Sequence, residues 1–123
     1  MGNIEKKKPE IYEKKWGCEQ WIDNNEEYCA KLLCFDKGAR FSMHFHVKKL
    51  ETWYVSKGKL KCTLINTFDA SEEVFELNEG EVIRIERYQP HRLEALEDSV
   101  VFEVSTQHFE DDSYRVAPGD SQK

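Results

Sequence analysis

Hydrophobic and polar residues alternate along most of this chain in short runs, a pattern that predicts an all-β protein. Successive side chains of a strand point to opposite faces, so a period of two gives one apolar and one polar face. Turn signals rich in Asp, Asn, Lys and Gly separate the runs. The pattern predicts about eight to ten short strands and no helix. The predicted strands fall within residues 11–22 (two strands with a bend at Trp16-Gly17), 28–35, 40–47, 51–56, 59–66, 72–77, 81–86, 92–96 and 99–106.

Short strands at such regular spacing are typical of a β-sandwich or a β-barrel. Periodicity alone leaves a jelly roll, a lipocalin-like barrel and a Greek-key barrel as alternatives. We expect a single folded domain over residues 11–116. The charged residues 1–10 predict a flexible N-terminal arm, and the polar residues 117–123 predict a flexible C-terminal tail.

The composition of the 123 residues narrows the choice of partner and compartment. The chain has 18 basic and 24 acidic residues and a net charge of −6, whereas nucleic-acid binding needs a net basic face. No apolar run approaches the ~20 residues of a membrane helix, and residues 1–10 do not resemble a signal peptide. The four cysteines occur singly, without C-x-x-C spacing, as reduced thiols do. We therefore expect a cytoplasmic protein with no nucleic-acid or membrane partner.

The stretch from Gly38 to Glu51 carries the candidate chemistry. His44 and His46 would share one face of a strand, with their Cα atoms roughly 6.5–7 Å apart. Two imidazoles at this spacing can bind one metal ion at about 2.0–2.2 Å. Glu51 opens the next apolar run, and His91, which follows a proline, is the best candidate for a further ligand. A lone histidine on an apolar strand is usually structural, but this set of four predicts a metal site.

These residues resemble a known family, the cupins. The first cupin motif, G-x5-H-x-H-x4-E-x6-G, is matched in full by Gly38, His44, His46, Glu51 and Gly58. The second motif, a glycine, a strand and then Pro-His, is similar to the segment from Gly80 to His91. Arg87-Tyr88 replaces a turn that is usually Pro-Gly-like, and Ala95 stands where Asn is frequent; neither position is a ligand. The resemblance implies a double-stranded β-helix, the cupin jelly-roll barrel, whose metal ligands are His44, His46, Glu51 and His91.

Three further stretches resemble cupins of the mannose-6-phosphate isomerase-like type. They are the entry segment 15–25, the strand 51–55, and a C-terminal signature within 103–115 that ends in E-D-D-x-x-R. The acid-and-Tyr-Gly-Arg tail of those proteins is absent, because Val116-Ala117-Pro118-Gly119 stands in its place. The resemblance implies a sugar or sugar-phosphate isomerase with one divalent transition metal ion, and it does not distinguish among Mn, Fe, Zn, Ni and Co.

An aldose–ketose isomerase moves a proton between adjacent carbons through an enediol, so a base must lie near the substrate. Glu51 is a poor base if its carboxylate binds the metal. Lys49, two residues earlier, and Glu103, in the last predicted strand, are the catalytic candidates. The alternatives are a solvated loop charge for Lys49 and an outward-facing strand residue for Glu103.

A phosphorylated substrate would need cationic partners, and arginine suits phosphate because it can donate two parallel hydrogen bonds. Arg84, near the second motif, and Arg115, in the C-terminal signature, are the candidate anchors. Surface ion pairs with the many carboxylates are the alternative for both. Trp53 shares a strand face with Glu51, so it is either part of the core or a wall of the sugar site.

Two other classes of function fit the same residues. The ligand set can bind Fe(II) with open positions, as a small metal-dependent dioxygenase requires. A cupin can also bind a sugar or another metabolite without catalysis. Cupins of this size generally pair, so the resemblance further implies a homodimer, in which residues 11–22 could add a strand to the partner's sheet.

Overall fold

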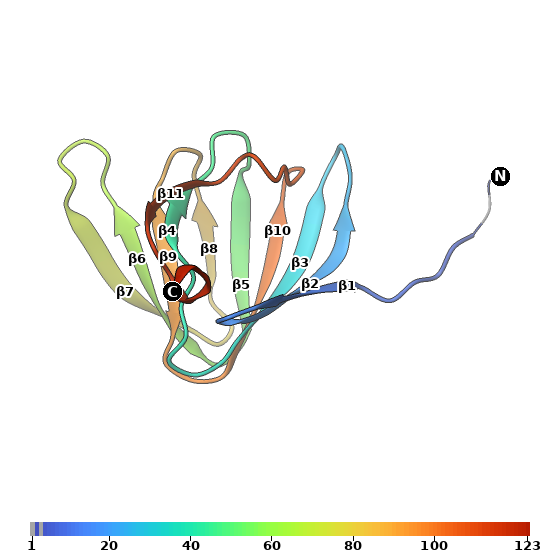
Figure 1. Cartoon of the computed structure of the whole chain (residues 1–123), viewed down its shortest axis with the longest axis horizontal. Coiled ribbons are helices and arrows are strands. Elements are labelled where there is room, and N and C mark those ends of the chain that lie inside the picture. Colours follow the sequence, from blue (N-terminus) through green and yellow to red (C-terminus); the bar gives the residue numbers. More distant parts are fainter. Residues whose placement is uncertain (1, 3) are drawn as a thin grey trace.

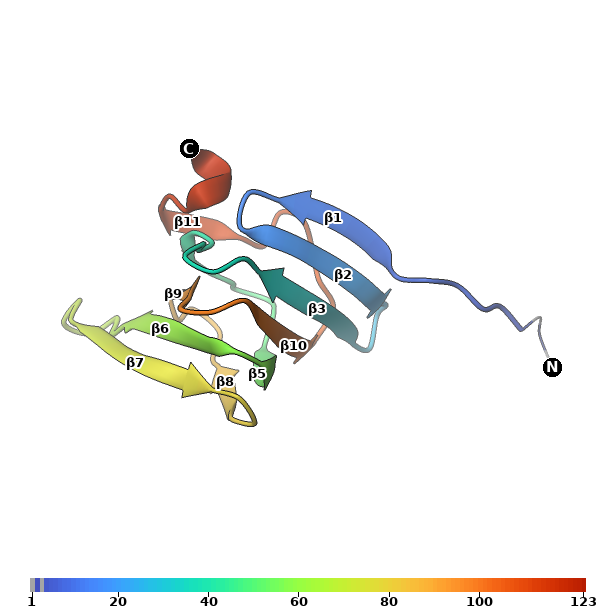
Figure 2. The ribbon, with the colours of Figure 1, turned by 90° about the horizontal axis from the view of Figure 1, so that it is seen from below.

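Two antiparallel sheets face each other and enclose the core (Figures 1 and 2). The computed structural model describes residues 2 and 4–123. Within them, the six-stranded sheet has the order β1-β2-β3-β10-β5-β8 and the five-stranded sheet the order β11-β4-β9-β6-β7. The elements are β1 (Glu10–Lys14), β2 (Gly17–Asn24), β3 (Cys29–Phe35), β4 (Met43–Phe45), β5 (Glu51–Lys57), β6 (Lys59–Ile65), β7 (Glu72–Asn78), β8 (Val82–Ile85), β9 (His91–Ala95), β10 (Ser99–Ser105), β11 (Tyr114–Ala117) and the 3₁₀ helix η1 (Asp120–Gln122). The expectation of an all-β jelly roll is confirmed. The described residues include no helix that is long and apolar enough to cross a membrane.

Strands β3 and β10 of the six-stranded sheet have a buried face that is apolar at one end and charged at the other. On β3, Phe35 and Leu33 point inward together with Lys31, and all three are buried. On β10, Val101 is followed on the same face by Glu103. The strand register places Lys31 opposite Glu103. The barrel interior is therefore divided into an apolar core and a polar region beside it.

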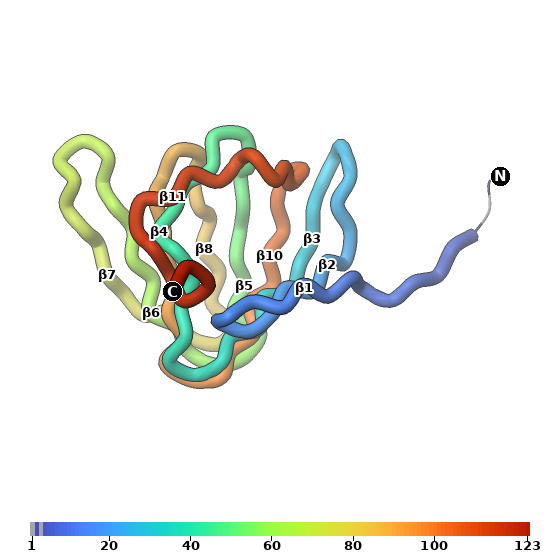
Figure 3. Tube along the Cα trace, viewed as in Figure 1, coloured from blue at the N-terminus to red at the C-terminus, as the bar shows by residue number. Residues whose placement is uncertain are grey.

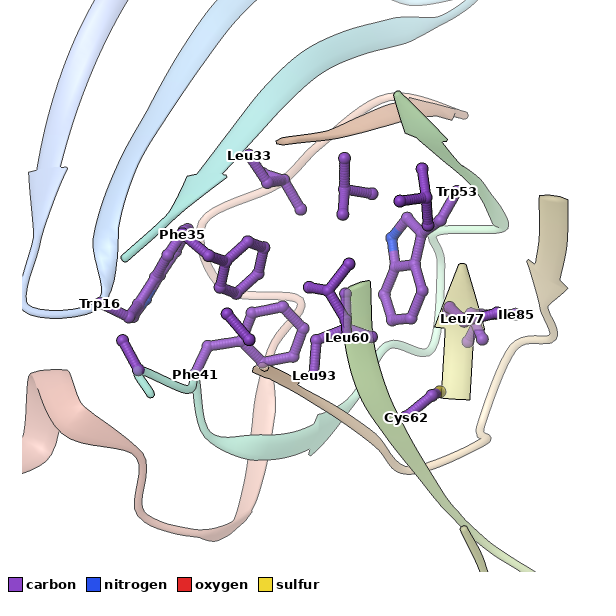
Figure 4. Close-up of a cluster of buried hydrophobic side chains, with 14 of the residues drawn as sticks. Trp16, Leu33, Phe35, Phe41, Trp53, Leu60, Cys62, Leu77, Ile85 and Leu93 are labelled. Carbon is purple, nitrogen blue, oxygen red and sulfur yellow. The ribbon is translucent and has the colours of Figure 1, made fainter. Parts of the chain in front are cut away.

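The apolar core fills the space between the two sheets (Figure 4). Trp16 stacks on Phe35 with ring centroids 4.7 Å apart, and Phe41 packs edge-on against Trp16 at 5.9 Å. From the five-stranded sheet, Leu60 and Leu93 are fully buried. Burying a side chain of this size contributes about 1.5–3 kcal/mol. This core gives the polar region a rigid base.

The C-terminal segment is more structured than the sequence pattern predicted. No strand was expected after residue 106, but the chain crosses the barrel there and forms β11 beside β4 (Figure 3). The backbone N–H of Arg40 donates to Asp120 Oδ2 at 2.9 Å, and that of Lys15 donates to Ser121 Oγ at 3.2 Å. A polar run gave no local signal for these pairings, which join residues far apart in sequence. The flexibility of residues 1–10 and 117–123 stays a prediction.

Candidate metal centre

Three histidine side chains meet inside the polar region of the barrel. His44 lies on β4, His46 follows directly after it, and His91 opens β9. The register of β4 and β9 places His44 opposite His91. One ligand atom of each histidine lies within 4.8 Å of the others, so the three form a group that could bind a metal ion. The two histidines at i, i+2 spacing and the distant histidine of the Pro-His sequence thus meet at one site, as the sequence predicted.

The backbone fixes which ring nitrogen of each histidine carries the proton. Each Nδ1 lies close to a carbonyl oxygen: 2.8 Å from His44 to Ser42, 2.6 Å from His46 to Asp112 and 2.9 Å from His91 to Gln89. A carbonyl oxygen only accepts hydrogen bonds, so each Nδ1–H donates. The unprotonated Nε2 atoms are then free for the centre, which is the arrangement of metal-binding histidines.

His91 and His44 are also held in their neutral form. Burial, together with the nearby His46, lowers the pKa of His91 to about 3. Burial and the two neighbouring imidazoles likewise lower the pKa of His44 well below its usual range. Because only a neutral imidazole can bind a metal, these residues are ready to do so at physiological pH.

Glu51 completes the donor set. It is 2 % exposed, and its carboxylate oxygens lie 3.5 Å from His46 Nε2 and 3.6 Å from His91 Nε2. Two ligands of one ion at 2.0–2.2 Å are about 3–3.6 Å apart, so these distances fit a shared ion. Glu51 Oε2 makes no hydrogen bond with any described residue, although Lys49 Nζ lies 3.1 Å away in an ion pair. The Lys49 ammonium is thus one cationic neighbour of this buried oxygen, and a bound metal ion would be a second. Three imidazoles and one carboxylate therefore fit a divalent transition metal.

Lys49 and Glu103 form a buried ion pair next to this donor set. Lys49 is 5 % and Glu103 4 % exposed, and Lys49 Nζ lies 3.2 Å from Glu103 Oε2. The alternatives of a solvated lysine and an outward-facing glutamate are therefore wrong. Burial lowers the pKa of Lys49, but Glu103 and Glu51 outweigh it and raise the pKa above its usual value. Lys49 is thus suited to donate hydrogen bonds rather than to act as a base, which leaves Glu103 as the candidate base.

An open cavity of about 280 Å³ gives access to these groups. It is lined by predicted site residues from several elements: His44, His46, Lys49, Glu51, Trp53, Glu103 and Arg115. Trp53 is both core and wall, since it is 1 % exposed and its indole N–H donates to Glu103 Oε1 at 3.4 Å. The volume is close to the lower end of the range for small-molecule sites.

Arg84 is not brought to the cavity, which corrects its assignment as a substrate anchor. It lies on the outer face of β8, and its side chain is 67 % exposed. Its Nε donates to Glu86 Oε1 at 3.0 Å. Strand alternation explains the error, because Ile83 and Ile85 take the more buried positions on either side.

Asp112 organises the metal centre, and sequence reasoning assigned it no role. Its carboxylate accepts the backbone N–H groups of Val47, Lys48 and Lys49 at 2.9, 3.0 and 3.0 Å. Burial raises the pKa of Asp112, but these three donors outweigh it and lower the pKa below its usual range. The side chain fixes the loop between His46 and Glu51, while the carbonyl of the same residue orients His46. The E-D-D sequence was visible, but its pairing with this loop was not.

Lys31, Glu19 and His108 also line the cavity, on the side of the six-stranded sheet. Lys31 Nζ lies 3.4 Å from Glu19 Oε1 and 3.2 Å from His108 Nδ1. Sequence reasoning missed this group. One signal was available, because Lys31 falls in phase with the buried Leu33 and Phe35 of β3.

Comparison with known proteins identifies the fold. The family model described as Cupin domain matches residues 31–106, more than half of the chain. Oxalate decarboxylase from Bacillus subtilis is similar, with a TM-score of 0.76 and 18% identity over 94% of this chain and 33% of that one. CapF from Staphylococcus aureus gives 0.78 and 17% over 91% and 33%. KdgF from Halomonas sp. gives 0.66 and 23% over 76% and 81%. The chain thus spans about a third of the first two, and at these identities the likeness shows the fold alone. No curated protein matches.

Proposed function

Because the chain belongs to the cupin family, we propose that it is a metal-dependent sugar or sugar-phosphate isomerase. One observation carries the proposal: His44, His46 and Glu51 of the metal-binding donor set line the same open cavity as the buried Lys49–Glu103 pair. Aldose–ketose isomerisation needs both a cation beside the substrate oxygens and a base beside the carbons. The likeness to CapF, a capsular polysaccharide assembling protein, is in keeping with carbohydrate chemistry.

His44, His46, His91 and Glu51 would together bind one divalent ion. Manganese is a candidate because oxalate decarboxylase, which shares the fold, has Mn(II) centres. The bound ion supplies Lewis acidity, which stabilises negative charge on neighbouring substrate oxygens. Fe, Zn, Ni and Co suit the same donor set, so metal analysis has to distinguish them.

The protein's own groups move the proton. Glu103 accepts the proton from C2 of the aldose and returns it to C1, while the hydroxyl proton passes from O2 to O1, so no oxidant or reductant is needed. The Lys49 ammonium lies 3.2 Å from Glu103 Oε2 and forms an ion pair with the carboxylate that takes part in this step. The indole N–H of Trp53 orients the second carboxylate oxygen. Trp53 and Phe41 form an apolar part of the cavity wall, which limits the access of water.

Arg115 supports a phosphorylated substrate. It lies on β11 opposite His44 and lines the same cavity as His44 and His46. A guanidinium there can donate two hydrogen bonds to a phosphate whose sugar reaches the metal centre. R115A is therefore expected to weaken the binding of a sugar phosphate, measured by calorimetry, with the metal content unchanged. Unchanged binding of the sugar phosphate by R115A would show that Arg115 is not a substrate anchor.

The test begins with metal analysis of the purified protein and of the H44A/H46A variant. We expect a near-stoichiometric transition metal in the wild type and none in the variant. The loaded protein is then incubated with mannose, lyxose and mannose 6-phosphate in D₂O, and conversion is followed by proton NMR. Conversion of one sugar, slowed about 10²-fold or more in E103Q at equal metal content, supports the proposal.

Three outcomes contradict it. A fully loaded protein that converts none of the sugars is not an isomerase for this substrate class. Oxygen uptake with a diketone favours a metal-dependent dioxygenase instead. Saturable sugar binding without conversion favours a non-catalytic binding protein.

We also propose that the protein is a homodimer. All five residues of β1 are exposed, and β1 is the edge strand of the six-stranded sheet. Ile11 and Tyr12 expose apolar surface there, and an uncovered edge strand is a ready site for pairing. Light scattering is expected to give twice the chain mass, and a monomer would contradict this.

A further inference from the structure

His108 is the one histidine outside the cupin motifs, yet it is firmly fixed in the cavity wall. Its backbone N–H donates to Asn24 Oδ1 at 2.8 Å, and its carbonyl accepts from Asn24 Nδ2 at 3.1 Å. Its ring packs edge-on against Trp21 with centroids 4.8 Å apart. These contacts set both the backbone and the ring plane of His108.

Lys31 decides the tautomer of His108. Lys31 is 3 % exposed and lies over the face of Trp21, with Nζ 4.1 Å from the ring centroid. The same Nζ is 3.2 Å from His108 Nδ1. An ammonium group only donates, so Nδ1 must accept and the ring proton must be on Nε2. This is the opposite tautomer to that of the three metal-site histidines.

The charges around His108 favour an uncharged ring. Burial and then Lys31 lower its pKa to about 4, with Lys49 adding to the effect and Glu110 and Glu103 opposing it. Glu110 Oε1 is the charged group that faces Nε2, at 3.4 Å. The Glu110 side chain is 87 % exposed, so it can move aside for a ligand. The result is a neutral N–H donor fixed at the wall of a cavity that also contains the metal centre.

We propose that His108 is a catalytic residue whose Nε2–H donates a hydrogen bond to the substrate oxygen on which negative charge develops. The proposal rests on the isomerase function above. The hydrogen bond strengthens as the C2 proton passes to Glu103 and weakens as that proton returns to C1, so His108 itself neither gains nor loses a proton. Neutral imidazoles of lowered pKa polarise the carbonyl group in this class of reaction. Lys31 is a positioning residue, because it acts through Nδ1.

The first test needs no sugar. Long-range proton–nitrogen NMR of ¹⁵N-labelled protein is expected to show His108 neutral, with its proton on Nε2, from pH 8 to pH 5. In K31M, the His108 pKa is expected to rise toward 6.5 and both tautomers to appear. K57M, which removes an exposed lysine at the end of β5, is the matched control and should leave His108 unchanged. A wild-type proton on Nδ1, or ordinary titration near pH 6.5, would overturn the inference.

The second test uses the sugar that the loaded wild-type protein converts. H108Q is expected to lower kcat by about 10²-fold at equal metal content, within the range for removing one hydrogen-bond donor to a developing oxyanion. K31M is expected to lower kcat less, because both tautomers are then present and only one of them offers Nε2–H to the substrate. If H108Q does not fold, the kcat of K31M relative to K57M at equal metal content decides the matter.

The outcomes separate this inference from the proposed function. An active protein in which H108Q retains its kcat would overturn the role of His108 alone. An inactive wild-type protein with His108 in the expected tautomer would overturn the isomerase function, and the catalytic role of His108 with it. Activity that falls in H108Q, with the expected NMR signature, supports both.

Discussion

The two sheets line one cavity with different chemistry. The five-stranded sheet carries the neutral imidazoles of His44, which lines the cavity, and His91, and each is tied to a backbone carbonyl through Nδ1. The six-stranded sheet contributes charged groups, among them Lys31, Glu103 and Glu51. The cavity wall from the five-stranded sheet presents nitrogen lone pairs that can bind a cation. The charged groups of the wall from the six-stranded sheet form ion pairs instead.

This difference shows how one barrel can keep a metal centre and an acid–base apparatus apart. Imidazoles positioned by backbone carbonyls depend on the fold alone, so they stay neutral and available. Buried ions depend on each other, because an unpaired buried charge is strongly destabilising. Glu51 connects the two walls, since it lies on β5 but its carboxylate faces both His46 and His91.

The largest stability effect is expected from breaking the charged wall at Lys49. K49M leaves the buried carboxylates of Glu51 and Glu103 without their shared cation. We expect the free energy of unfolding of the metal-free protein to fall by about 3–5 kcal/mol. Urea denaturation measures this, with K57M as the exposed-lysine control. A loss below about 1 kcal/mol would show that the pair is not a stabilising element.

The next effect concerns the wall of neutral histidines. D112N replaces one acceptor oxygen by an NH₂ group, which faces a backbone N–H that needs an acceptor. The loop between His46 and Glu51 then loses its anchor, and we expect metal affinity to fall 10–100-fold. Competition with a chelator measures the affinity. D111N, at the exposed neighbouring position, is the matched control, and equal affinities in the two variants would refute the role of Asp112.

The dependence of stability on pH tests the charged wall without breaking an ion pair. The pKa of His108 is about 4 in the folded state and about 6.5 in the unfolded chain, so between these values the unfolded state binds more protons. Stability is therefore expected to fall as the pH is lowered from about 6.5 to 4, by up to about 1.4 kcal/mol per pH unit from this group. Urea unfolding at several pH values should show a shallower slope for H108Q than for wild type. Equal slopes would mean that the pKa of His108 is not lowered in the folded state.

The smallest effect is expected outside both walls. R84A removes an exposed ion pair with Glu86 on the outer face of β8. We expect the free energy of unfolding to change by no more than about 0.5 kcal/mol, and metal content and sugar conversion to stay the same. A large loss of sugar-phosphate binding in R84A would return Arg84 to the substrate site.

The local pattern was sufficient for the strands up to residue 106 and for the histidine set. A period of two decides which face a residue takes, so it placed His44 with His46 and Trp53 with Glu51. The motif glycine Gly58 marks a turn that only glycine suits, because its φ is +90° and a Cβ there would lie 2.2 Å from Ser99 Oγ. These are properties of a few neighbouring residues.

The sequence by itself therefore determined the all-β class, the family resemblance and the histidine set, since each depends on short-range spacing. Only the tertiary structure decided that Asp112 anchors the loop after His46, that Arg84 faces outward, and that Lys31 meets His108. The contact between Lys31 and His108 joins residues 77 apart in sequence, and those of Asp112 span 63 to 66 residues. Periodicity gives the face of a strand but not its partner, and it is the pairing of distant segments that sets the tautomers and charges of this cavity.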